Sequence, residues 1–107
     1  MDTNGLWAAE FSTAFASGTG IVVLDRDQVR GGDSNYFYIG TFYRTGQQFA
    51  GRLAVTHYVG PPRSVFGDAR KLELKLNGSI GPTLIVAQGY PEHDPSLLIG
   101  IKMRRLA

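Results

Sequence analysis

A glycine pair followed by an aspartate, Gly31-Gly32-Asp33, is the segment of this chain that most invites a chemical interpretation. Glycine loops that bind phosphate open a helix, whose first backbone N–H groups face the anion. Here the next residues, 34–38 (SNYFY), are typical of a turn that leads into a strand. We therefore interpret the segment as a turn or bulge. We expect its glycines to adopt positive φ angles and the Asp33 carboxylate to accept backbone N–H groups.

The two histidines are the other candidates for chemistry. His57 is expected on the inward face near a strand end, where it could orient a ligand or hold a haem, but a hydrogen-bonded rim position is favoured. His93 lies between Glu92 and Asp94, a weak candidate for a metal site. Adjacent turn positions point apart, so a solvated turn is favoured. We predict no metal and no cofactor.

Nucleophilic catalysis is not supported by the residues available. The chain has no cysteine and only two histidines, and no serine lies in a nucleophile-elbow pattern. Asp25 and Asp27 fall in an expected turn, where solvent would leave them ordinary carboxylates. The sequence therefore predicts a protein that is not an enzyme, with no catalytic residue.

The elements that must position these residues are strands. In "KLELKLN", residues 71–77, the leucines share one face and the charged residues share the other, as in a half-buried antiparallel strand. Turn residues separate such runs at short intervals, and no segment shows a helical period. We predict strands at 5–14, 19–25, 28–31, 35–44, 48–58, 70–79, 83–90 and 96–105, with further pairing possible around residues 64–66.

Eight short antiparallel strands in a meander must close or fold over, or their edges stay open. The hairpin-like spacing favours an all-β, up-and-down β-barrel over a two-sheet sandwich. A barrel of about eight strands is filled by side chains or holds one small ligand. The candidate lining of such a cavity is Trp7, Phe11, Phe49, Leu53, Val55, His57, Leu72, Leu74 and Leu76.

Composition sets the remaining bounds. The 107 residues are expected to form one domain, 1–107, large enough to bury a core without disulfides. No basic segment followed by a long apolar run opens the chain, so a soluble cytoplasmic protein without a membrane span is expected. The net charge is only +2 and the basic residues are scattered, which makes nucleic-acid binding a disfavoured function.

Several predicted strands are apolar on both faces, and "GIVVL", residues 20–24, is an example. One face must be core, so the other needs cover. We therefore expect a homodimer that buries part of the outer barrel face. The candidate interface residues are Val22, Leu24, Tyr36, Phe37 and Tyr38.

Gly5-Leu6-Trp7 near the start and Arg104-Arg105 near the end resemble the ends of lipocalin-like barrels. In those barrels a tryptophan of the first strand is capped by an arginine of the last, a cation–π contact that plugs one end. By strand parity, Arg105 is the expected partner of Trp7.

A second resemblance covers nearly the whole chain, and is clearest over residues 5–58. The segment "GTGIVVLDRDQVRGGDSNYFYIGTF", residues 18–42, and the "SVFG" stretch, 64–67, resemble the GrlR-like family, small negative regulators of type III secretion in bacteria. That resemblance implies a lipocalin-like barrel, a homodimer, and function through protein contact. Partner binding in the family is associated with an acidic hairpin. The corresponding residues 44–48 (RTGQQ) contain no acid, so no partner-binding residue is carried over.

Two hypotheses follow for the function. The first is a non-enzymatic regulatory or adaptor protein that acts as a homodimer on a protein partner. The alternative is a carrier of a small apolar ligand or lipid in the barrel interior.

Overall fold

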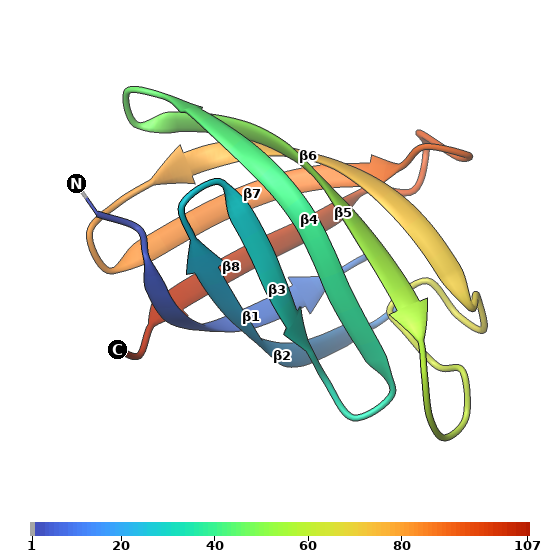
Figure 1. Cartoon of the computed structure of the whole chain (residues 1–107). Coiled ribbons are helices and arrows are strands. Elements are labelled where there is room, and N and C mark those ends of the chain that lie inside the picture. Colours follow the sequence, from blue (N-terminus) through green and yellow to red (C-terminus); the bar gives the residue numbers. More distant parts are fainter. Residues whose placement is uncertain (1) are drawn as a thin grey trace.

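The computed structural model describes residues 2–107 as one closed barrel of eight antiparallel strands (Figure 1). Each strand pairs with its neighbours in sequence, and the first strand pairs with the last. The strands are β1 (Gly5–Ser12), β2 (Ser17–Asp25), β3 (Gln28–Gly32), β4 (Tyr36–Thr45), β5 (Gln48–His57), β6 (Lys71–Ile80), β7 (Leu84–Pro91) and β8 (Ile99–Arg105). The predicted up-and-down barrel is confirmed.

The first strand is shorter than predicted. It ends at Ser12, where the Thr13 backbone N–H and side chain bond to the Ala16 carbonyl and close a tight turn. Phe15 is 86% exposed on that turn. The predicted pairing around residues 64–66 is a single bridge between Ser64 and Gly67 rather than a strand of the sheet.

The barrel has two unlike ends. One end carries both chain termini and the hairpins β2–β3, β4–β5 and β6–β7, and is called here the closed end (Figure 1). The other end carries the turns β1–β2, β3–β4 and β7–β8 and the long connection 58–70 between β5 and β6. It is called here the mouth.

Alternating side chains of all eight strands fill the interior, as expected for a barrel of this size, and Val29 is the contribution of β3. The inward set contains the following buried hydrophobic residues: Trp7, Ala9, Val22, Leu24, Tyr36, Tyr38, Phe42, Leu53, Val55, Leu72, Leu74, Ile80, Ile85, Ala87, Ile99 and Ile101. Residues 2–107 contain no helix, and hence none long and apolar enough to cross a membrane.

Candidate functional site

The closed end is sealed by Trp7 and Arg105, the pair expected from strand parity. Arg105 lies opposite Trp7 in the β1–β8 ladder, and its guanidinium carbon is 4.5 Å from the indole ring centre. Trp7 is fully buried, and its Nε1 donates a hydrogen bond to the Thr3 carbonyl at 3.1 Å. Arg105 also donates to the carbonyls of Pro82 (3.0 Å) and Asn4 (2.9 Å). These contacts tie both termini to one plug, so this end is structural.

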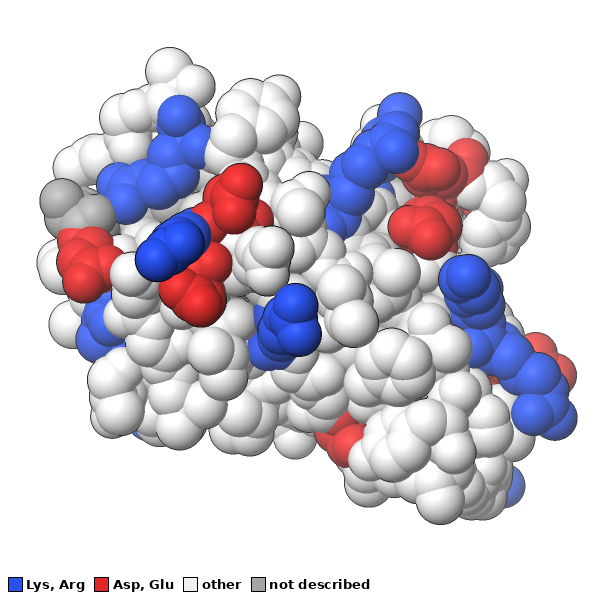
Figure 2. All heavy atoms as spheres, in the orientation of Figure 1, with Lys and Arg blue, Asp and Glu red and all other residues white. Residues whose placement is uncertain are grey.

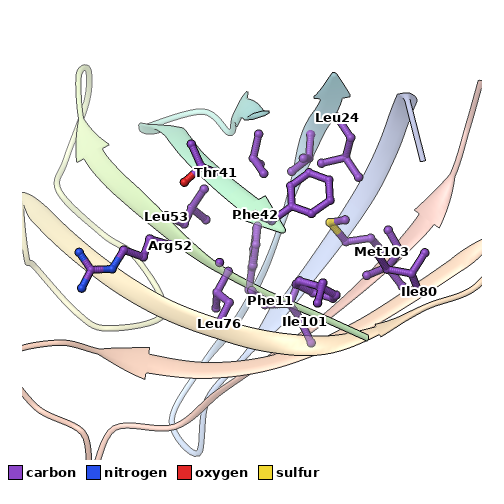
Figure 3. A pocket seen from close by; sticks show the side chains of 16 residues that line it. Phe11, Leu24, Thr41, Phe42, Arg52, Leu53, Leu76, Ile80, Ile101 and Met103 are labelled. Atoms are coloured by element: carbon purple, nitrogen blue, oxygen red, sulfur yellow. The ribbon is translucent and has the colours of Figure 1, made fainter. Parts of the chain in front are cut away.

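The half of the interior next to the closed end is nearly full. It contains a cavity of about 60 Å³, which is bordered mainly by apolar residues and also by Thr41 and Arg52. Figure 3 shows Phe42, Leu53 and Met103 pointing into this space, while the guanidinium of Arg52 points away from it. Arg52 instead pairs with Glu92 at 2.9 Å. Small-molecule sites have volumes of about 300–1,000 Å³, so this cavity is too small for an organic ligand.

The half next to the mouth is hollow. Its pocket has a volume of about 390 Å³ and is lined both by interior side chains and by the turns of the mouth. The interior part comes from Phe11, Tyr38, Leu53, Val55, Leu74 and Ile99; the mouth contributes Ser17 to Thr19, Asp33 to Tyr36 and Arg63 to Phe66. The volume and the mixed lining are those of a small-molecule site.

The predicted cavity residues divide between these spaces. Phe11 and Leu53 line both, and they mark the boundary between the halves. Phe49 and Leu76 line only the closed half, while Val55 and Leu74 line only the mouth pocket.

Trp7, Leu72 and His57 line neither space, although they were candidates. Trp7 is occupied by the plug. His57 lies at the rim, with its Nε2 2.6 Å from the Gly60 carbonyl oxygen and its ring edge-on to Tyr36 at 5.5 Å. That arrangement matches the hydrogen-bonded rim position favoured from sequence.

Asp33 organises the β3–β4 turn at the mouth. Its Oδ1 accepts the backbone N–H groups of Asn35 (2.9 Å) and Tyr36 (2.8 Å), and its Oδ2 accepts the Tyr38 hydroxyl. Burial, followed by the hydrogen bond and negative charge of Asp33, raises the pKa of Tyr38. The expected capping role of Asp33 is therefore present, and its carboxylate also accepts a hydrogen bond from the buried phenol of Tyr38.

The glycines before Asp33 serve a different purpose from the one predicted. Gly31 and Gly32 are strand residues of β3, and neither is among the glycines with positive φ. A Cβ at Gly31 would lie 2.1 Å from the Ile21 carbonyl oxygen, and one at Gly32 would lie 2.9 Å from the Tyr36 carbonyl oxygen. Only glycine permits β3 to approach its neighbours this closely.

Among residues 2–107, no group of three or more His, Asp or Glu side chains is arranged to hold a metal ion. The residues beside His93 have other partners, because Glu92 pairs with Arg52 and Asp94 accepts the Ser96 hydroxyl at 2.6 Å. The hydrogen bond from Ser96 lowers the pKa of Asp94. The segment is thus an exposed turn held by Asp94.

The candidate interface residues need correction. Val22, Leu24, Tyr36 and Tyr38 point into the barrel and are 1–4% exposed, so they cannot contact another molecule at the outer surface. Phe37 does point outward, and is 39% exposed. The alternation of residues separated the side chains of each of these strands into two faces. Because both faces are apolar, the sequence could not identify which one points inward.

The outward set forms an apolar surface over β2, β3 and β4 that the exposed Arg30 interrupts between Val23 and Ile39. Ile21, Val23, Phe37 and Ile39 are 39–48% exposed, and we call these four residues the outer apolar face. The register connects them: Ile21, Gly32 and Phe37 form one row across the strands, and Val23, Arg30 and Ile39 form the next. Figure 2 shows uncharged atoms over much of these strands, with one basic group over their middle and further charged groups at the β2–β3 hairpin.

Comparison with models of known protein families gives no match for this chain, and no curated protein matches its sequence.

Proposed function

We propose that this chain is a non-enzymatic regulatory or adaptor protein that acts through protein contacts as a homodimer, with the outer apolar face as its self-association surface. The observation that carries the proposal is the exposure of Ile21, Val23, Phe37 and Ile39 in two adjacent rows. A monomer rarely leaves several large apolar side chains close together in water, and a cluster of this kind is typical of an interface.

A second copy is the occupant that we propose for this face. Gly32 lies in the register between Ile21 and Phe37, so no larger side chain separates these two apolar residues. In a two-fold dimer the same patch serves both copies, so an apolar face can cover itself. Tyr58 packs edge-on against Phe37 at 6.2 Å and extends the face with an aromatic ring suited to interfaces.

The regulatory part of the proposal rests on the resemblance of residues 18–42 and 64–67 to the GrlR-like family. Under that proposal the chain would act in the cytoplasm of a bacterium on a protein partner of a secretion system. The acid-free hairpin at residues 44–48 implies a partner different from the one that the family's acidic hairpin binds.

Charge substitution on the outer apolar face tests the dimer. Ile39→Glu buries a carboxylate in the proposed interface, so it should convert the dimer to a monomer at micromolar concentration in sedimentation velocity. Lys75→Glu is the matched control, because Lys75 is exposed on β6, away from this face. Equal masses for the two folded variants would contradict the proposal.

Carriage of a small ligand is the second candidate function. The observation that favours it is the pocket of about 390 Å³ at the mouth, since the closed half offers only about 60 Å³. A ligand would therefore occupy one half of the barrel rather than its whole interior. Native mass spectrometry of the purified chain tests this candidate, which requires a co-purifying small molecule or an added one that binds.

A further inference from the structure

The mouth pocket has an apolar floor. Phe11 and Tyr38 meet edge to face, with ring centres 5.5 Å apart, at its base. Leu53, Val55, Leu74 and Ile99 complete the wall, and all four are buried hydrophobic residues. Such a floor favours a hydrocarbon or aromatic body and offers it no hydrogen bond except at the Tyr38 hydroxyl, which already donates to Asp33.

The connection 58–70 forms one side of the pocket opening. Phe66 packs against the buried core, and Val65 is held by a hydrogen bond of 3.1 Å from the Thr13 hydroxyl to the Val65 carbonyl. The connection is anchored further along by the Tyr36 hydroxyl, which donates to the Ala69 carbonyl at 2.5 Å. The opening is thus bounded by an ordered segment with its own contacts.

The two charged groups of the rim differ in what they can still bind. The Asp33 carboxylate accepts three hydrogen bonds from its own turn and from Tyr38, so most of its lone-pair sites are used. Arg63 also lines the pocket, and within residues 2–107 its guanidinium makes no hydrogen bond or ion pair. Its five N–H donors match a carboxylate in a two-point contact. The unsatisfied group of this rim is therefore a cation.

We propose that the mouth pocket binds a small amphipathic carboxylate, whose apolar body lies against Phe11, Val55 and Leu74 and whose carboxylate pairs with Arg63. A volume of about 390 Å³ sets the size of this ligand. Since a water molecule occupies about 30 Å³ in the liquid, the pocket holds about a dozen groups of that size. Short to medium aliphatic acids and small aromatic acids fit this limit. This inference deepens the second candidate function and does not depend on self-association.

Octanoate and octan-1-ol separate the two parts of the proposed site, because they share an apolar chain and differ in charge. NMR titration should shift the methyl signals of Val55 and Leu74 with both probes, and octanoate should bind more tightly. Arg63→Gln should weaken octanoate about five-fold, the effect of one partly exposed ion pair, and leave octanol unchanged. Arg104→Gln, an exposed arginine on the outer surface of β8, should change neither affinity.

Leu74→Trp fills the pocket from its floor and should weaken both probes. Because that variant could fold poorly, the decision rests on Arg63→Gln, whose side chain is exposed. Equal affinity of octanoate and octanol for the unmodified chain, or an unchanged octanoate affinity in Arg63→Gln, would overturn the assignment of Arg63. Absence of shifts at Val55 and Leu74 with either probe would overturn the site and the carrier function together, while leaving the proposed dimer unaffected.

Discussion

The closed end and the mouth of the barrel are built from the same eight strands, yet they differ in how completely their side chains fill the space. At the closed end Trp7 and Arg105 form a plug, and the adjoining cavity is about 60 Å³. At the mouth Asp33, Tyr38 and the connection 58–70 surround about 390 Å³. The comparison indicates that the closed end holds the barrel together, and that the mouth is the half of the interior available for binding.

Removal of a side chain from the plug should cost more than removal of a comparable one from the mouth. Trp7→Ala leaves a large cavity in the sealed end and should lower the free energy of unfolding by about 3–5 kcal/mol. Phe66→Ala removes a partly buried ring at the mouth and should cost about 1 kcal/mol. Urea denaturation of both variants measures the difference. Equal losses would mean that the two ends contribute alike to stability.

The close approach of β3 to β2 at Gly31 is a second tightly packed place, and it lies outside the plug at the closed end. Gly31→Val would press its Cβ against the Ile21 carbonyl oxygen, so it should lower stability by about 3 kcal/mol. Gly18→Val is the control, since a Cβ there meets nothing nearer than Val65 at 3.7 Å. Thermal unfolding followed by circular dichroism compares them. A Gly31→Val protein as stable as Gly18→Val would refute the role of close strand approach.

The side chains of Arg105 and Arg104 point to opposite faces of β8, so the two residues allow a matched test of the plug. Arg105→Met removes the cation from the Trp7 ring and the hydrogen bonds to the carbonyls of Pro82 and Asn4. It should therefore cost about 1–2 kcal/mol. Arg104→Met changes an exposed side chain and should be close to neutral. Chemical denaturation measures the free energy of unfolding of both variants. An equal loss in both would show that the plug contributes no specific stability.

The smallest expected effect is a dependence on alkaline pH that originates at the mouth. The pKa of Tyr38 is raised above its ordinary value of 10.0 by burial and by Asp33, so the folded state keeps the phenol protonated. The unfolded chain releases this proton near pH 10, and stability therefore falls as the pH rises above that value. Tyr38→Phe should lose less stability between pH 9 and about pH 11 than the unmodified chain does.

Tyr43→Phe provides the control for this pH dependence, because Tyr43 is 69% exposed on β4. It should follow the unmodified chain across the same range in urea denaturation. If Tyr38→Phe also follows it, the buried phenol at the mouth does not govern alkaline stability.

Much of the fold was predictable because the signals are local. Alternation in residues 71–77 and turn residues such as Gly46 placed most strands within a few residues of their observed ends. Parity also identified Arg105 as the partner of Trp7. The capping role of Asp33 followed from the short reach of its side chain to the next backbone N–H groups.

The rest depends on neighbours that are distant in sequence. Residues 20–24 are apolar on both faces, so only the closed barrel determines that Val22 points inward and Ile21 outward. The role of Gly31 depends on the carbonyl of Ile21 in the adjacent strand, and φ preference alone suggested a turn. The mouth pocket depends on where residues 63–66 fold back, and these residues have no periodic signal.

The outer apolar face lies on the outside of β2, β3 and β4 and belongs to neither end of the barrel, so we explain its exposure by self-association. Light scattering of the unmodified chain during size-exclusion chromatography, at micromolar concentration, tests this claim most directly. The proposal predicts a particle of twice the 11.7 kDa chain mass. A mass of 11.7 kDa, unchanged as the concentration rises, would contradict it.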